Sequence, residues 1–387
     1  MGTERRGMLA LEDGSLHVGR SLAAQGEWVG EVVFVTSMTG YQETITDPSY
    51  WGQMVVFTCP HIGNVGVNEE DMEARQPHVR AVLARRIAQR ASNWRAQREL
   101  VDVLSDAGVP ALDGIDTRRL TLTLRKTGVM RGALSTASLE PERLVQLARN
   151  APDMGTLSPV DQVTSSQNHG WCHTVAGAWH NAVGEDLRSD PGCPHVVVID
   201  CGAKENILRL LVGLGARTTV VPAGATAQEI LALTPDGVLI SNGPGDPEQA
   251  TITIETVRDL MGRVPLYGIC LGHQIICLAA GGRTYKLPFG HHGCNHPVQE
   301  LASGRISITS QNHNYAVAPD SLAGLPYEVT HLNLFDQTIE GLRHKVLPIA
   351  SVQYHPESSP GPHDSFALLK GFVNSLTIHG GIDAAAC

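Results

Sequence analysis

The sequence predicts an α/β protein: a C-terminal, mostly parallel sheet with helices on both faces, preceded by a smaller mixed α and β N-terminal domain. From residue 195 onward, short apolar runs alternate with segments of helical character. This is the pattern of strands that are buried on both faces and joined by helices. Before about residue 150, β-rich runs are mixed with one predicted helix. A chain of 387 residues with 42% hydrophobic content can bury the cores of two domains.

The N-terminal domain is predicted to span residues 1–150. Runs rich in β-branched and aromatic residues at 31–36 and 53–58 predict strands, and residues 115–127 predict a helix. Residues 151–193 are rich in Pro, Gly, Ser, Asn and His and have no sustained period, so we interpret them as a connecting segment.

The C-terminal domain is predicted to span residues 194–380. Ligands of mostly parallel sheets collect beyond the carboxyl ends of the strands, so the loops after these strands are where we look for chemistry. The predicted strands lie at 195–200, 218–222 and 237–241, and the predicted helices between them at 206–214 and 227–233.

Charge and composition exclude several classes of function. The formal net charge is −10, so no basic field is available to hold nucleic acid or an anionic membrane surface. No apolar run approaches the roughly 20 residues that cross a bilayer, and the apolar stretch near the N-terminus is too short for a secretory signal. The eight cysteines include no CxxC pair, so we expect reduced thiols and a cytoplasmic location.

Cys270 is the candidate nucleophile. An apolar strand ends directly before it and a helical segment follows, while Gly268 and Gly272 flank it in a Gly-x-Cys-x-Gly pattern. Small neighbours permit the strained turn that presents a reactive atom. A helix N-terminus favours the thiolate, and backbone N–H groups such as that of Leu271 could hold an oxyanion. The alternative is a buried structural cysteine.

The candidate base is His355, which follows another short apolar run. Pro356 biases His355 toward an extended conformation, and Glu357 is placed to orient the imidazole through a ring nitrogen. The His-Pro-Glu triplet alone would be weak, since such triplets arise by chance.

These two motifs, together with SNGPGDP at 241–247, resemble the triad-type (class I) glutamine amidotransferases. The resemblance implies that Cys270 attacks the glutamine amide, that His355 acts as base and acid, and that Glu357 orients His355. It leaves the final product open, because many synthases carry this domain.

Motifs of the N-terminal half are similar to those of the carbamoyl-phosphate synthetase small subunits, a family of glutaminase chains. The resemblance implies a large-subunit partner that makes carbamoyl phosphate from bicarbonate and ATP for pyrimidine and arginine synthesis, in a heterodimer that could assemble further. It implies no cofactor in this chain, with ATP and metal ions on the partner. The matching segments are TSMTGYQETITDPSY (36–50), PHIGNVG (60–66), IDTRRLT (115–121), GHHGCNHP (290–297), SQNHNY (310–315) and SPGPHD (359–364).

The resemblance also implies a glutamine pocket closed by residues of both domains. Members of the family often have Gly at position 314 and Phe at position 315, so any positive φ at 314 would here be adopted by Asn. The implied glutamine-binding residues are Ser37, Gly243, Gly245, Leu271, Gln274, Asn312, Asn314 and Tyr315.

Two other features are set aside. His291, His292 and His296, with Cys294 among them, could suggest zinc, but no second ligand pair has a familiar spacing, so no metal is expected. Residues 200–206 follow a predicted strand but lack the phosphate-loop pattern, so we interpret them as a strand-to-helix turn.

Two competing hypotheses remain. The same triad could serve another acceptor or hydrolyse γ-glutamyl groups freely, which co-purification with a carbamoyl-phosphate-forming subunit would exclude. The chain could instead be a non-catalytic interaction subunit, against which Cys270, His355 and Glu357 argue together.

Overall fold

The structure is a computed structural model that describes residues 5–174 and 193–378. It divides into two compact units. The N-terminal unit comprises Met1–Pro159, Leu287–Cys294 and Ser359–Gly361; the C-terminal unit comprises the rest of the chain.

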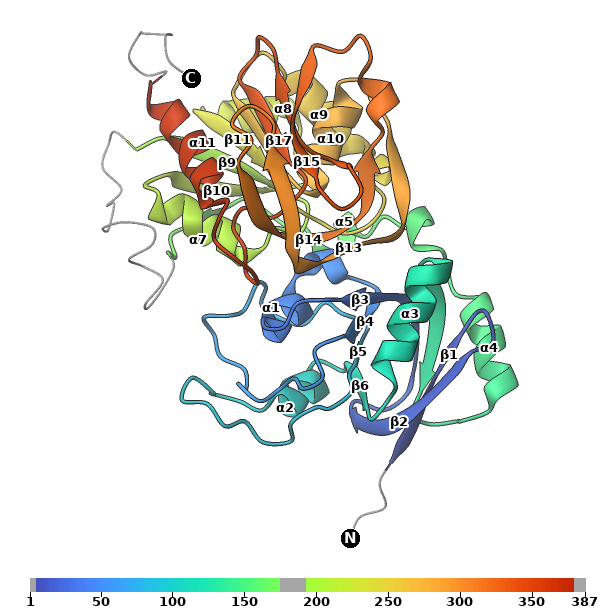
Figure 1. The fold of residues 1–387 in the computed structure, drawn as a ribbon. Coiled ribbons are helices and arrows are strands. Elements are labelled where there is room, and N and C mark those ends of the chain that lie inside the picture. The colour runs from blue at the N-terminus through green and yellow to red at the C-terminus, as the bar shows by residue number, and fades with distance from the viewer. Residues whose placement is uncertain (1–4, 175–192, 379–387) are drawn as a thin grey trace. The chain divides into compact units, whose positions relative to one another are not determined.

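The N-terminal unit is built around a closed barrel, with the strands in the order β1-β2-β6-β5-β4-β3-β7 (Figure 1). The neighbours β3, β4, β5 and β6 run parallel, and antiparallel pairing of β1 with β7 closes the barrel. The strands are β1 (Arg6–Leu11), β2 (Leu16–Ala23), β3 (Glu27–Val35), β4 (Gln53–Phe57), β5 (Ala81–Leu83), β6 (Pro110–Asp113) and β7 (Met130–Ser135).

Alternate residues of the central barrel strands enter different apolar clusters, as the period of 2 of a strand requires. In β3, Val32 packs in one cluster with α3, whereas Val33 packs in a second cluster with α2. The helix predicted at 115–127 is confirmed as α3, which begins after its N-cap Asp116. The helices are α1 (Tyr41–Thr46), α2 (Leu100–Asp106), α3 (Thr117–Thr127) and α4 (Pro141–Arg149).

The C-terminal unit contains one large sheet, whose strand β13 includes the residues Leu287–Cys294 that are assigned to the N-terminal unit. Among the described residues it has ten strands in the order β14-β13-β15-β16-β17-β12-β11-β9-β10-β8. The block from β10 to β17 is parallel, and antiparallel strands extend it on both sides. The strands are β8 (His169–Trp171), β9 (His195–Asp200), β10 (Arg217–Pro222), β11 (Gly237–Ile240), β12 (Leu266–Ile269), β13 (Thr284–Glu300), β14 (Ile306–Val317), β15 (Tyr327–Asn333), β16 (Ile339–His344) and β17 (Ile349–Val352).

Helices cover both faces of the parallel block, as the sequence predicts (Figure 1). One apolar cluster joins residues of α8, α9 and α10 to the sheet, and a second joins α7 and α11 to the other face. The helices are α5 (Val160–Val163), α7 (Glu205–Gly213), α8 (Ala227–Ala232), α9 (Thr251–Leu260), α10 (Leu271–Ala279) and α11 (Phe366–Ile378).

The predicted fold class is confirmed, and the predicted strands and helices between 195 and 241 agree with the structure to within about one residue at each end. Part of the segment interpreted as a connection is ordered: β8 pairs antiparallel with β10 at the edge of the sheet. Residues 175–192 of that segment lie outside the described residues. The antiparallel extension from β13 to β16 was not predicted, because its strands alternate irregularly between buried and exposed positions.

The cysteines within the described residues are all free. In the same part of the chain, no helix combines the length and the apolar character needed to span a bilayer.

Candidate functional site

Cys270 lies on the turn between β12 and α10, in a conformation that non-glycine residues rarely adopt. Its φ is 54° and its ψ is −103°. A residue held in such a region costs about 1–3 kcal/mol and persists only where its surroundings enforce it. Here the Cys270 N–H donates to the carbonyl of Val352 on β17 (2.9 Å), and the side chain is 2% exposed. The strand-to-helix turn predicted from the sequence is therefore present, with the strain typical of a nucleophile turn.

The flanking glycines allow the turn because the backbones around it are in close contact. A Cβ at Gly272 would come within 2.1 Å of the carbonyl oxygen of Ile240 on β11, and one at Gly268 within 2.6 Å of the Gly272 backbone. Any side chain at either position would push α10 away from the sheet.

His355 and Glu357 lie just beyond β17, the neighbour of β12 in the sheet. The Nδ1 atom of His355 is 2.6 Å from Oε1 of Glu357, and both side chains are buried. The His355 N–H donates to the Ser310 carbonyl (2.9 Å), which fixes the backbone. The structure thus joins His355 and Glu357 as the sequence predicts, with Nε2 as the ring nitrogen left for chemistry.

Two residues that the sequence analysis did not single out hold Glu357. Lys204, which is 1% exposed, donates from Nζ to Oε1 of Glu357 (3.0 Å) and to the carbonyl of Ser358. Asn206 donates from Nδ2 to the carbonyl of Glu357 (2.7 Å). Both residues follow β9, so the turn predicted at 200–206 also supplies the cation that neutralises the buried carboxylate.

Charge interactions shift the pKa values of the pair in opposite directions. Burial alone would lower the pKa of His355, but Glu357 and then Cys270 raise it to about 10. Burial alone would raise the pKa of Glu357, but Lys204 and then His355 lower it to about 2. Glu357 is therefore ionised at neutral pH, and His355 holds its proton firmly when the sulfur of Cys270 carries negative charge.

Two backbone amides beside Cys270 are available as donors. Among the described residues, neither the Leu271 N–H nor the Gly243 N–H donates a hydrogen bond. The two residues are neighbours, since the Leu271 side chain lies 2.8 Å from where a Cβ of Gly243 would be. The Leu271 amide also begins α10, where the helix dipole favours negative charge. Free donors of this kind stabilise the oxyanion of a tetrahedral intermediate.

Several of the other predicted glutamine-binding residues contact one another along β14. Gln274 donates from Nε2 to the carbonyl of Tyr315 (2.7 Å), and the Cys270 thiol donates to the carbonyl of Asn312 (3.5 Å). Asn314 lies within β14 and does not have a positive φ, so the Asn at this position adopts no strained conformation. Gly245 does have a positive φ, of 91°, in the loop after β11.

Ser37 belongs to the N-terminal unit, where its Oγ lies 2.9 Å from Sγ of Cys294. His292 packs against Tyr50 in the same unit, with ring centroids 5.8 Å apart. In the C-terminal unit, Nδ1 of His296 is 3.3 Å from Nδ2 of Asn333. These contacts give Cys294, His292 and His296 separate structural partners.

The arrangement in the C-terminal unit can perform acyl transfer. It combines a thiol on a strained strand-to-helix turn, a histidine with its orienting carboxylate, and two free backbone donors, all at the carboxyl edge of parallel strands. These are the parts needed to form and hydrolyse a thioester.

Two family models match the chain. The model described as "Carbamoyl-phosphate synthase small chain, CPSase domain" matches residues 9–134, and "Glutamine amidotransferase class-I" matches residues 197–375.

Curated proteins are similar to the chain over almost its whole length. One is the carbamoyl phosphate synthase small chain of Aquifex aeolicus, 50% identical over 95% of this chain and 97% of the relative. Proteins of the same name from Synechococcus sp. (51% identical over 95% of this chain and 92% of the relative) and Syntrophotalea carbinolica (47%, over 96% and 98%) are also similar.

Proposed function

This chain belongs to the carbamoyl-phosphate synthase small-chain family, and we propose that it hydrolyses L-glutamine with Cys270 and supplies the ammonia to a large synthetase subunit. The observation that carries the proposal is the 2.6 Å contact between His355 and Glu357 beside the strained Cys270. The large subunit makes carbamoyl phosphate from bicarbonate and ATP, for pyrimidine and arginine synthesis.

The first half of the reaction forms a thioester. His355 takes the proton of the Cys270 thiol, and Sγ attacks the side-chain amide carbon of glutamine. The N–H groups of Leu271 and Gly243 bind the oxyanion that forms. The tetrahedral intermediate then collapses: the C–N bond breaks, His355 returns the proton to the leaving nitrogen, and ammonia departs.

The second half regenerates the enzyme. His355 takes a proton from a water molecule that attacks the γ-glutamyl thioester. The C–S bond then breaks, His355 returns the proton to the Cys270 sulfur, and glutamate leaves. Glu357 stays ionised throughout and stabilises the imidazolium that forms in each half, while Lys204 neutralises Glu357.

Binding of glutamine is assigned to the residues that the family resemblance implies. The backbone groups of β14 and of the loops after β11 and β12 hold the substrate in the C-terminal unit, and Ser37 contributes from the N-terminal unit. The set is Ser37, Gly243, Gly245, Leu271, Gln274, Asn312, Asn314 and Tyr315.

The partner and the location follow from the same proposal. The chain carries no cofactor of its own, and ATP and metal ions bind the large subunit. The two subunits form a heterodimer, which can assemble further, in the cytoplasm. Ammonia passes between them by an enclosed route, because bulk water would protonate it and remove its nucleophilicity.

The test is formation of carbamoyl phosphate by the chain mixed with its large subunit, with either glutamine or ammonia as nitrogen donor. We expect Cys270→Ser to lower the glutamine-dependent rate by about 10³-fold or more and to leave the ammonia-dependent rate unchanged. Cys277→Ala is the matched control on α10, because burial raises the Cys277 pKa to about 12 and keeps its thiol inert. Wild-type chain that supports the ammonia reaction but not the glutamine reaction would overturn the proposal in favour of an interaction subunit.

A further inference from the structure

The outward face of α3 carries four cations around one exposed leucine. Positions 118, 122, 125 and 126 of a helix share one side, and position 119 borders it. The opposite side, with Leu120 and Leu124, is buried in the N-terminal unit, whereas the side chain of Leu122 is 51% exposed. We call the outward set the α3 face: Arg118, Arg119, Leu122, Arg125 and Lys126.

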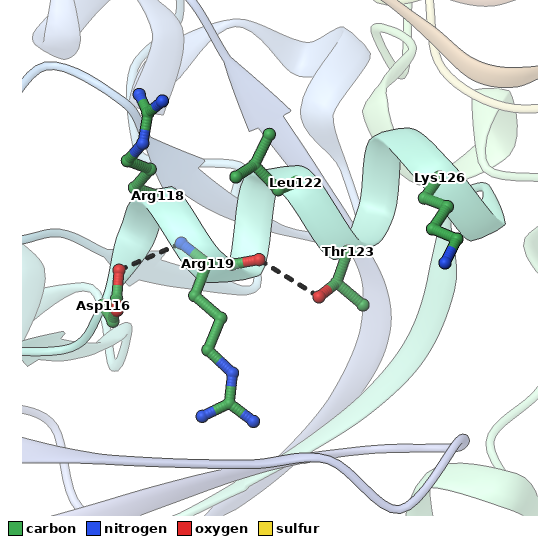
Figure 2. Close-up of a pocket in the computed structure, with 6 residues that line it drawn as sticks. All are labelled: Asp116, Arg118, Arg119, Leu122, Thr123 and Lys126. Atoms are coloured by element: carbon green, nitrogen blue, oxygen red, sulfur yellow. Dashed lines mark hydrogen bonds between the residues drawn. The ribbon is translucent and has the colours of Figure 1, made fainter.

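The α3 face borders a hollow of about 450 Å³. Figure 2 shows Arg118 and Leu122 pointing toward one edge of this outward face, with Arg119 and Lys126 pointing toward the other edge. Every residue that lines the hollow comes from positions 116–126, so it is open along one helix and does not enclose a ligand. A small molecule would be held from one side only, which is not how ligand pockets are built. The hollow suits a segment of another protein.

None of the four cations makes an ion pair with a described residue. Asp116 is the acidic residue beside them, and its Oδ1 accepts the backbone N–H of Arg119 (2.9 Å) as the helix N-cap. Elsewhere in the same unit, arginines do find carboxylates: Arg20 pairs with Asp113 and Arg131 with Glu12, each at 2.6 Å. In a chain of net charge −10, these four cations form a local group of positive charge that no described carboxylate neutralises in an ion pair.

Only two of these four cations stabilise the helix α3 itself. Arg125 and Lys126 lie in the last turn, where positive charge interacts favourably with the helix dipole. Arg118 and Arg119 lie in the first turn, where the dipole disfavours positive charge. The helix dipole therefore does not account for the two arginines at the N-terminal end, whereas a negatively charged external group would stabilise them.

We propose that the α3 face is a docking surface for an acidic segment of the large synthetase subunit. The proposal rests on the proposed function, which requires such a partner. Leu122 is the apolar anchor at the centre, and the cations form the charged rim that is typical of protein interfaces rich in Arg. The rim draws the acidic segment in by long-range attraction, so salt weakens the association.

The test measures association of the full-length chain with the purified large subunit at low and at raised ionic strength. The variant is Arg118→Glu combined with Arg119→Glu. Acidic residues are favoured in the first turn of a helix, so this variant is expected to fold. The matched control reverses two exposed cations of the C-terminal unit that also lack ion pairs, Arg263→Glu with Lys370→Glu. Leu122→Asp tests the anchor.

We expect the α3 double variant to slow association by about tenfold or more and to weaken its dependence on salt, because rim charges act mainly on the association rate. The control should change the rate by less than about threefold. Leu122→Asp should accelerate dissociation, since central anchors act there. At saturating large subunit, glutamine-dependent synthesis by the double variant should recover.

Three results would overturn the docking surface. If the α3 double variant associates with the large subunit as fast as the control variant does, the α3 face is excluded as a docking surface. The proposed function then stays intact. In a second case, the wild-type chain binds tripolyphosphate saturably while the double variant does not, although the double variant keeps its affinity for the large subunit. That result would assign the face to a small anion. Failure of the wild-type chain to bind the large subunit at all would overturn the proposed function, and this inference with it.

Discussion

Two groups of charged residues in this protein differ in whether the chain itself supplies their ion-pair partners. Around Glu357, the buried carboxylate meets Lys204 and His355 within 3.0 Å, and all three side chains are at most 2% exposed. On the α3 face, four exposed cations have no carboxylate partner among the described residues.

The difference follows from what each environment can supply. A buried charge is costly unless the fold itself neutralises it, because no water or partner can reach it. An exposed charge costs little when it is alone, so it can be kept for another molecule. The charge of the buried carboxylate is therefore neutralised within the chain and the group serves chemistry, whereas the exposed cations are left without an ion-pair partner among the described residues and serve association.

The largest expected effect is on catalysis by the buried group. His355→Asn should lower glutamine hydrolysis by about 10³-fold, because it removes the group that moves the proton between Cys270 and the leaving nitrogen. Single-turnover hydrolysis of glutamine in the complex measures it. His61→Asn, at an exposed histidine, is the control. A loss of less than tenfold would show that His355 is not the base.

The second effect is on stability. Lys204→Met should lower the free energy of unfolding by about 3 kcal/mol, because it leaves the Glu357 carboxylate buried without its cation. Arg209→Met, which removes a pair with Glu205 on the same helix α7, should cost about 1 kcal/mol or less. Urea unfolding monitored in the C-terminal unit compares them. Equal losses in the two variants would remove the distinction between a fully buried and a partly exposed charge pair.

The third effect is a change in pH dependence. The folded pKa of His355, about 10, lies above its ordinary value of 6.5, so its contribution to stability is complete below about 6.5 and is lost as the pH rises toward 10. The folded pKa of Glu357, about 2, lies below 4.5, so its contribution is complete above about 4.5 and is lost as the pH falls toward 2.

Glu357→Gln should therefore lower the pKa of His355 and reduce the loss of stability between pH 6.5 and 10. Titration of the His355 ring by NMR and unfolding at a series of pH values measure the two changes. An unchanged His355 pKa in the variant would contradict the assigned charge coupling.

The smallest expected effect is on the stability of the α3 face. Arg118→Ala with Arg119→Ala should leave the unfolding free energy of the isolated chain within about 0.5 kcal/mol of wild type, or raise it slightly, since it removes positive charge from a helix N-terminus. Thermal or urea unfolding of the N-terminal unit measures it. A loss above about 1 kcal/mol would mean that these arginines stabilise the fold and are not reserved for a partner.

The sequence predicted those parts of the site that are encoded locally. Cys270 stands between two glycines at a strand end, and His355 and Glu357 stand in one triplet, so short motifs sufficed. Lys204 was missed because its role depends on a contact across 153 residues of chain. A lysine in the turn that follows a buried strand, four residues after the end of β9, was the available signal.

For the fold as well, local elements could be predicted from the sequence, but contacts between distant segments could not. Strands β9 to β12 were predicted because continuous apolar runs mark strands that are buried on both faces. Closure of the barrel was not predicted, because it depends on pairing between β1 and β7, more than a hundred residues apart, which no local pattern specifies.

Because β17 pairs with β12 but comes much later in the chain, the catalytic site can form only late in synthesis on the ribosome. All barrel strands precede residue 136, but His355 emerges 220 residues after Ser135 (355 − 135). At roughly 5–20 residues per second, that interval lasts about 10–40 s. The barrel strands are thus complete long before β17 can pair with β12, and Cys270 waits without its base until the last strand of the sheet is made. A nascent or truncated chain that ends before β17 would carry the thiol but, without His355, could not release ammonia from glutamine.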